Sequence, residues 1–235
     1  MEMKKTDFRN FTLDKLNTEE YSHLKLLLYW PVYGLLFYFV ERVYTPGGYI
    51  VMHCALDDAI PFCEYFLIPY LFWFVYLIGT LAYTLFCDRD GFRRMMYFVI
   101  FTYSITILIY LLFPTCQHLR PSVFPRDNAF TRFVAYFYQF DTDTNVCPSL
   151  HVIGSFAACF ALWNTERFAS KGWRAVNVLC CVLICVSTVF MKQHSVLDVA
   201  AALPLCFGGY ALCYLTNPPR RVKITSSAKV KGGGI

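Results

Sequence analysis

The stretch YFLIPYLFWFVYLIGTLAYTLF, residues 65–86, decides the fold, because it is predominantly apolar and no charged residue lies between Glu64 and Asp88. A helix needs about 20 mostly apolar residues to cross the roughly 30 Å hydrocarbon core of a bilayer. Every backbone amide in that core must be paired inside the segment, which a helix achieves. Residues 65–86 are therefore predicted to form a transmembrane helix.

Five similar blocks surround this one. They cover residues 26–43, 95–113, 149–165, 175–191 and 199–216. The whole chain is 57% hydrophobic and 16% charged, whereas soluble domains average about 25% charged residues. We predict an all-α integral membrane bundle of six transmembrane helices. Its domain covers residues 26–216, between an N-terminal arm at 1–25 and a flexible basic tail at 217–235.

The basic residues indicate how the bundle is oriented. If the N-terminus is cytoplasmic and six helices alternate, only five of the 21 Lys and Arg residues fall in outer segments: Arg42, Arg120, Arg126, Arg132 and Lys192. This excess of inner cations follows the positive-inside rule. We predict a multi-pass protein of the cell membrane with both termini cytoplasmic. Nucleic acid is not an expected partner, because the cations flank apolar spans; the oligomeric state stays open.

Three polar clusters lie on the predicted outer face, at the ends of different spans. Arg120-Pro121 follows the third span, CPSLH (147–151) begins the fourth, and KQHSVLD (192–198) joins the fifth and sixth. Ionisable groups beside hydrocarbon are costly unless they are paired or used. Each cluster alone has an ordinary explanation, such as a snorkelling anchor for Arg-Pro or a helix start for Pro-Ser. Together they define a candidate site.

This set of residues suits phosphoryl transfer, which needs positive charge around the phosphate oxygens, an in-line nucleophile and an acid for the leaving group. Arg120 offers a fork of donors, and Lys192 offers a compact charge. Ser149 begins a helix, and helix N-termini bind anions. These three residues are the predicted phosphate contacts, and the substrate is predicted to be a lipid phosphate in the bilayer.

The two histidines supply the titrating groups. Asp198 follows His194 by four residues, so both lie on one face of a helical turn. The carboxylate would hold one ring nitrogen of His194 and leave the other to attack phosphorus. His151 would then protonate the leaving oxygen.

The same spacing occurs at His53 and Asp57, but no cation follows Arg42 in that loop. We therefore interpret His53 and Asp57 as structural or head-group contacts. Asp58, Asp141 and Asp143 are further candidates for head-group contact.

In order along the chain, Arg-Pro, Pro-Ser-x-His and Ser-x6-His-x3-Asp across a six-span core resemble the type 2 phosphatidic acid phosphatase superfamily. The resemblance covers roughly residues 26–216. It implies a nucleophile at His194, an orienting Asp198 and an acid at His151, with phosphate contacts at Arg120 and Ser149.

Three positions depart from this family pattern. Phe113 stands where the family has a lysine, Thr188 where it has an arginine and Leu150 where it has a glycine. The Pro-Ser-Leu-His and Gln-His-x-x-x-Asp motifs are closer to the branch with inositol phosphorylceramide synthase-like phosphotransferases. Transfer to a hydroxyl acceptor is therefore an alternative to hydrolysis.

The predicted function is that of a lipid phosphatase acting through a phosphohistidine at the outer membrane face. Three alternatives stay open: a phosphotransferase that moves a phospho-head group between lipids, a catalytically inactive lipid-binding relative, and a zinc hydrolase using His118, His151 and His194. No cofactor or metal is expected, because catalytic zinc ligands usually show paired helical spacings.

The loop at 114–147 carries one more helical pattern. Its apolar residues recur at helical spacing after candidate caps at Asp127 and Asn128: Phe130, Phe133, Val134 and Phe137. This pattern predicts an interfacial helix that lines a lipid entry path or anchors the loop as an aromatic belt. Cys54, Cys63, Cys116 and Cys147 fall on the outer side, and their pairing is left open.

Overall fold

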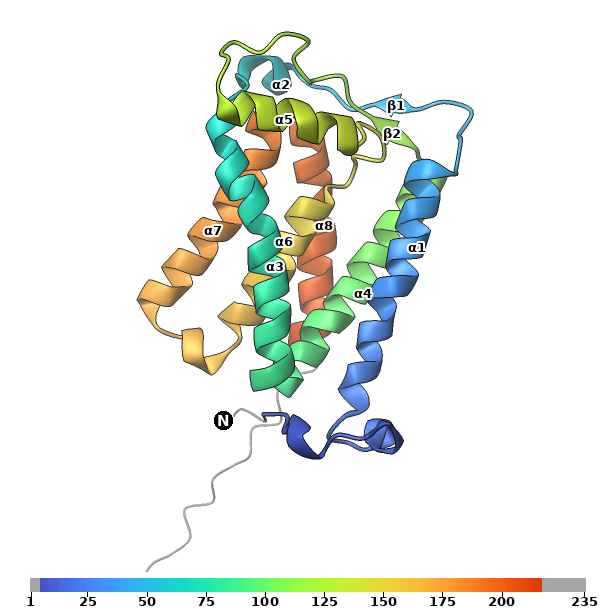
Figure 1. Ribbon diagram of the computed structural model, residues 1–235, viewed down its shortest axis with the longest axis vertical. Coiled ribbons are helices and arrows are strands. Elements are labelled where there is room, and N and C mark those ends of the chain that lie inside the picture. Colours follow the sequence, from blue (N-terminus) through green and yellow to red (C-terminus); the bar gives the residue numbers. More distant parts are fainter. Residues whose placement is uncertain (1–4, 217–235) are drawn as a thin grey trace, which may run out of the picture.

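The computed structural model describes residues 5–216. The predicted basic tail, 217–235, lies outside the described residues. Within the described range, six longer helices run side by side and the remaining short elements lie at the two ends of the bundle (Figure 1). The longer helices are α1 (Tyr29–Arg42), α3 (Leu67–Cys87), α4 (Arg89–Leu112), α6 (Leu150–Trp163), α7 (Lys171–Phe190) and α8 (Val196–Tyr210).

The short elements complete this arrangement. Short 3-10 helices occupy Phe8–Asn10, Leu13–Asn17, Ser22–Leu28, Glu64–Phe66 and Glu166–Phe168, and a π turn, Ala211–Leu215, extends α8. The other helices are α2 (Ala55–Ala59) and α5 (Ala129–Phe140). Strands β1 (Ile50–Val51) and β2 (Thr115–Cys116) pair in parallel, with Ile50 opposite Thr115. These strands tie the loop between α1 and α3 to the loop between α4 and α6.

The prediction of an all-α membrane bundle is confirmed. Five helical segments of the described chain are long and apolar enough to cross a membrane: Ser22–Arg42, Glu64–Cys87, Arg89–Leu112, Lys171–Phe190 and Val196–Leu215. The remaining predicted span, 149–165, is a shorter apolar helix of 14 residues, α6. Because α6 packs against α3, α4, α7 and α8, it is surrounded by protein and need not match the bilayer thickness.

Local capping explains where the helices begin. Asp88 accepts a hydrogen bond from the Gly91 amide and starts α4 at Arg89, six residues before the predicted start at Met95. Ser149, Ser170 and Ser195 cap α6, α7 and α8 in the same way. The first amides of a helix lack intrahelical partners, so a side-chain oxygen there fixes the boundary more sharply than apolar composition does.

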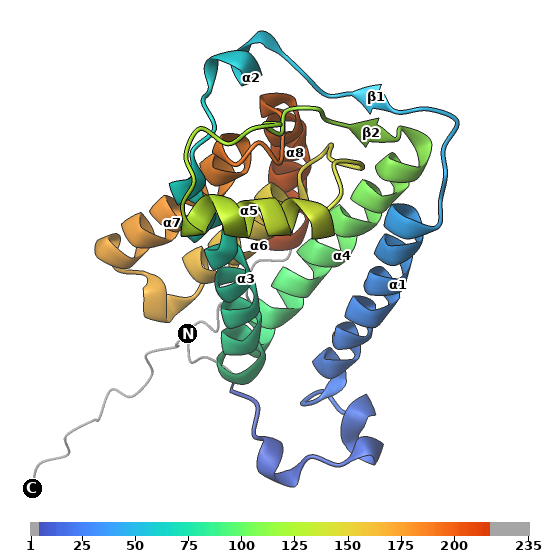
Figure 2. The same ribbon diagram turned by 45° about the horizontal axis from the view of Figure 1, so that its top comes forward.

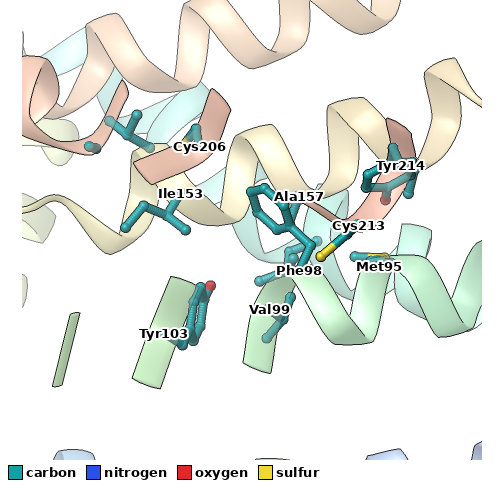
Figure 3. Close-up of a cluster of buried hydrophobic side chains, with 13 residues drawn as sticks. Met95, Phe98, Val99, Tyr103, Ile153, Ala157, Cys206, Cys213 and Tyr214 are labelled. Carbon is teal, nitrogen blue, oxygen red and sulfur yellow. The ribbon is translucent and has the colours of Figure 1, made fainter. Parts of the chain in front are cut away.

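The main core lies where α4, α6 and α8 meet (Figure 3). Met95, Phe98 and Val99 of α4 are fully buried there. Ile153 and Ala157 of α6 belong to the same cluster, which continues along the C-terminal segment to Cys213 and Tyr214. This packing fixes the central position of α6. All eleven cysteines fall within the described residues and are free thiols.

The predicted helix of the third loop is confirmed as α5. Asn128 caps it, and the Thr131 side chain accepts from the Asn128 amide in return. The helix lies crosswise over one end of the bundle (Figures 1 and 2). Val134 is fully buried on its inner face, whereas Phe133 is 45% exposed and faces away.

The two ends of the bundle carry different short elements. One end, called the α5 end here, carries α2, both strands and α5; the opposite end carries the N-terminal arm (Figure 1). At the opposite end, Arg89 and Arg93 both donate to the backbone carbonyl of Glu19. These two basic residues of a predicted inner loop therefore contact the arm, and the side of the membrane to which this end belongs stays a prediction.

Candidate functional site

His194 is the residue directly before the N-cap of α8, and it is held by the first turn of that helix. Its Nδ1 lies 3.2 Å from Oδ2 of Asp198. The Ser195 amide donates to the same carboxylate oxygen at 2.9 Å. A carboxylate accepts, so Nδ1 carries the proton and the lone pair of the imidazole is on Nε2. His194 is 8% exposed.

His151 lies in the first turn of α6 and approaches the same point from another helix. Its ring stacks on Tyr70 and lies against Trp73 of α3, with centroid distances of 4.5 Å in both cases. The centroids of the His151 and His194 rings are 5.9 Å apart, and the two rings meet edge to face. Nε2 of His151 is buried and has no hydrogen-bond partner among the described residues. Two imidazoles distant in sequence therefore converge.

Backbone contacts hold these two helix starts together. The Ser149 amide donates to the carbonyl of Asp198 at 3.2 Å, which joins the beginning of α6 to α8. The Ser149 hydroxyl caps α6 by accepting from the Val152 amide. Tyr110 of α4 donates to the carbonyl of Pro148 at 2.8 Å. In this structure the Ser149 hydroxyl serves the helix start, and its role as a phosphate contact stays a prediction.

Both histidines line a cavity of about 310 Å³. Its wall comes from α1, α3, α4, α5 and α6 and consists largely of aromatic rings. The ionisable and amide side chains on it are His151, His194, Gln193, Asn145, Glu41 and Asp141. Within the described chain, no Lys or Arg lines this cavity.

Arg120 does not line the cavity, and its guanidinium is held by oxygens of residues beside the site. Nη1 donates to the carbonyls of Tyr138 and Asp141 at 3.1 and 3.0 Å. Nη2 donates to the Thr142 carbonyl and to Oε1 of Gln193, both at 2.7 Å. The guanidinium also lies 4.6 Å from the Tyr138 ring centroid. Arg120 therefore fixes the end of α5 and the following loop, and phosphate contact by Arg120 stays a prediction.

Gln193 is a site residue that the sequence analysis missed. Because arginine can only donate, Arg120 fixes the carbonyl end of the Gln193 amide toward itself. Nε2 of Gln193 is buried without a partner among the described residues. Its place directly before His194 was the only sequence feature that could have pointed to Gln193. Nothing in the sequence shows whether this amide binds Arg120 or is exposed.

Further neutral donors lie on the same cavity. Trp73 Nε1 and the Tyr103 hydroxyl are buried and unpartnered within the described residues. Both face Gly154 of α6, where an added Cβ would lie 2.9 Å from Trp73 Nε1 and 2.8 Å from the Tyr103 hydroxyl. Gly154 thus leaves room for two donors at the wall.

The structure does not bring Lys192 into the cavity. Lys192 has a left-handed backbone with φ of 53°, and its Nζ donates to the carbonyls of Asp57 and Ile60 at 2.6 and 2.5 Å. Burial lowers the pKa of Lys192, although the nearby Asp57 and Asp58 carboxylates act in the opposite sense. Lys192 lines a separate pocket with His53 and Asp58, and its phosphate contact stays a prediction.

Asp57 is a second residue whose importance the sequence did not reveal. It is 1% exposed. Its Oδ2 accepts from the Ser195 hydroxyl at 2.6 Å and from the Cys54 amide at 2.8 Å, and its Oδ1 accepts from the Val196 amide at 2.8 Å. His53, in contrast, pairs with Asp58 and not with Asp57. Asp57 therefore anchors the loop between α1 and α3 to the start of α8, at the two residues that follow His194 in the sequence.

We expect Asp57→Asn to lower stability by about 1–3 kcal/mol near neutral pH, because a buried hydrogen-bonded carboxylate loses its charge. Burial alone would raise the pKa of Asp57, but the bonds from Ser195, Val196 and Cys54 together lower it. A lowered native pKa contributes stability above the ordinary carboxyl pKa of about 3.9, and this contribution falls as the pH drops through the native value. In detergent, the thermal unfolding temperature of Asp57→Asn should lie below that of the wild-type protein at pH 7, and the two temperatures should converge in acid. A constant difference would contradict this role.

The zinc alternative is not supported by the positions of its proposed ligands. His118 lies in the pocket around Lys192 and not in the cavity with His151 and His194. The described residues contain no group of three or more His, Cys, Asp or Glu side chains placed to hold a metal ion.

Fold and site together define an all-α integral membrane protein with a buried pair of histidines from two helices. The family model described as the PAP2 superfamily matches residues 51–212, and the chain belongs to this superfamily. Membership supports a lipid enzyme of the phosphatase or phosphotransferase type. No curated protein and no solved structure matches the chain. The resemblance to the inositol phosphorylceramide synthase-like branch stays a prediction.

The matched range begins after α1. Even so, α1 contributes Trp30 and Glu41 to the cavity wall.

Proposed function

We propose that this protein is a lipid phosphatase that acts through a phosphohistidine at Nε2 of His194. One observation carries the proposal: the His194 and His151 rings lie 5.9 Å apart on one cavity, and Asp198 occupies Nδ1 of His194. A nucleophile held by a carboxylate, with a second imidazole beside it, matches the requirements of phosphoryl transfer.

The reaction consists of two balanced steps. In the first, the Nε2 lone pair of His194 attacks phosphorus, the bond from phosphorus to the lipid oxygen breaks, and that oxygen takes a proton from His151. In the second, water attacks the phosphohistidine, His151 takes a proton from this water, and the bond between phosphorus and Nε2 breaks. Asp198 stabilises the positive charge that develops on the His194 ring.

The phosphate oxygens would be received by neutral donors. The side-chain amide of Gln193, on the cavity wall next to His194, has a buried N–H without a partner among the described residues. A buried unpaired donor is costly, so a ligand that supplies an acceptor gains from pairing with it. Neutral donors suit a phosphate with one negative charge better than a doubly charged one.

Transfer to a lipid alcohol is a second candidate, and the composition of the cavity wall favours it. Aromatic rings from four different helices contribute nine of the twenty lining residues, among them Tyr33, Trp73, Tyr110 and Phe137. Such a wall disfavours bulk water, which competes with an alcohol as the acceptor. The chemistry up to the phosphohistidine is shared, so only the acceptor differs.

A substrate panel tests both candidates. Purified protein should release or transfer phosphate from at least one of several lipid monophosphates, pyrophosphates and phosphodiesters, and an added alcohol should divert product if transfer is the main reaction. Vanadate should inhibit turnover, since it adopts the five-coordinate geometry of a phosphoryl transfer, and chelators should not. Intact cells given external lipid should show turnover if the α5 end faces outward. Binding without turnover on every lipid would instead indicate an inactive relative.

A further inference from the structure

The cavity carries two acidic side chains without a cationic partner. Glu41 lies in the last turn of α1 and Asp141 directly follows α5, and both line the wall. Glu41 accepts a hydrogen bond from the Thr142 hydroxyl. Neither carboxylate belongs to an ion pair in the described part of the chain. Burial raises the pKa of Asp141, although Arg120 and His194 partly oppose this.

Carboxylates that form no ion pair are costly in a mostly apolar cavity, and the cost falls when a cation lies beside them. This arrangement is unexpected for a site that must also receive a negatively charged phosphate. The conflict is resolved if the substrate head group itself brings the positive charge.

Aromatic faces surround the same space. Trp30, Tyr33 and Phe37 come from α1, Trp73 from α3 and Phe140 from the end of α5. Rings of this kind attract cations through their quadrupoles, and they do so most effectively where water is excluded. A trimethylammonium group has no N–H to satisfy, so it fits between rings without leaving unpaired donors. A polyhydroxyl head group would leave most of its hydroxyls facing these rings.

We infer that the substrate is a lipid phosphodiester whose head group carries a quaternary ammonium, which Glu41, Asp141 and the surrounding rings select. This inference rests on the phosphohistidine chemistry of the proposed function and makes the substrate of that site a diester. His194 attacks phosphorus, the bond from phosphorus to the lipid oxygen breaks, and that oxygen takes the proton of His151. The phospho-head group stays on Nε2 until water or an alcohol attacks it. The phosphate faces His194 and His151, and the ammonium occupies the acidic and aromatic part of the cavity. The substrate thus presents one negative charge to neutral donors and one positive charge to the carboxylates.

The experiment compares lipids that share their acyl chains and differ in head group: phosphocholine, phosphoethanolamine, phosphoinositol and the bare monophosphate. The wild-type protein should turn over the phosphocholine lipid with the highest kcat/KM. Glu41→Gln should reduce the ratio of kcat/KM for the phosphocholine lipid over the monophosphate lipid by about tenfold or more, as expected for a lost charge facing a desolvated cation. Asp141→Asn should act in the same direction.

Asp143→Asn is the matched control: Asp143 was a candidate for head-group contact beside Asp141, but the structure places it outside the cavity lining. This variant should keep the wild-type ratio. Binding of the same lipids to His194→Ala measures the head-group preference without chemistry. A preference in binding without any turnover by the wild-type protein would contradict the proposed function and support the inference. A wild-type preference for phosphoinositol, phosphoethanolamine or the monophosphate, or an unchanged ratio in Glu41→Gln, would overturn the inference.

Discussion

Replacing His194 by alanine should reduce kcat for lipid turnover by at least about 10⁴-fold, because the nucleophile is lost. In wild-type protein, rapid quenching with a lipid labelled at phosphorus should trap label on the protein in an alkali-stable, acid-labile bond, as expected for phosphohistidine. The His194→Ala protein should trap none. Binding of the lipid should persist, since Gln193, His151 and the cavity wall remain in place.

His53→Ala is the control for this experiment. His53 is an exposed histidine at the α5 end, paired with Asp58 and outside the cavity. The His53→Ala protein should keep most of the lipid turnover and all of the trapped label. If the two variants lost activity equally, the assignment of His194 as the nucleophile would be wrong.

Replacing His151 by glutamine should lower kcat by about 10²–10⁴-fold, the usual contribution of general acid catalysis. The loss should depend on the leaving group. A lipid-like substrate with an aryl phosphate needs no proton on its leaving oxygen, so its formation of phosphohistidine should be nearly normal. An alkyl phosphate should react slowly.

The measurement is the ratio of aryl to alkyl turnover in the two proteins, with trapped label recorded for each substrate. The phosphohistidine should accumulate with the aryl substrate, because His151 also accepts the proton of the attacking water. An equal loss on both substrates would show that His151 only positions the lipid. Its contacts with Tyr70 and Trp73 would then be its main role.

Much of the fold could be predicted because apolar blocks of about 20 residues have few structures open to them in a bilayer. The residues at which the helices begin and end were harder to predict. Asp88 extends α4 backward by capping it at Arg89, a local hydrogen bond that hydropathy does not register. The interior position of α6 depends on packing by four other helices, which a single segment does not encode.

The convergence of His151 and His194 followed from counting spans, since both fall at the same predicted end of the bundle. Asp198 followed from its spacing. The cations were harder to place, because their side chains are long and backbone carbonyls compete for them. Arg120 is occupied by carbonyls at the end of α5, and Lys192 is turned toward the first loop by its left-handed backbone.

The acidic and aromatic part of the cavity could not be predicted at all. Glu41 and Trp73 belong to separate spans, and their meeting depends on the rotation of each helix about its axis. Nothing in either block distinguishes a ring that faces lipid from one that faces a cavity. Only the packed bundle shows that α1 closes the wall.

The shortness of α6 has a consequence for how a lipid meets this protein. Its 14 residues span about 21 Å, whereas the hydrocarbon is about 30 Å thick. His151, at its start, stacks on rings that lie three and six residues into α3, or about 5–9 Å below the beginning of that helix. A phosphate reaching these imidazoles must sink beneath its neighbours in the leaflet. At that level water is scarcer than in the aqueous phase, so the depth of the site bears directly on whether water or a lipid alcohol takes the phosphoryl group.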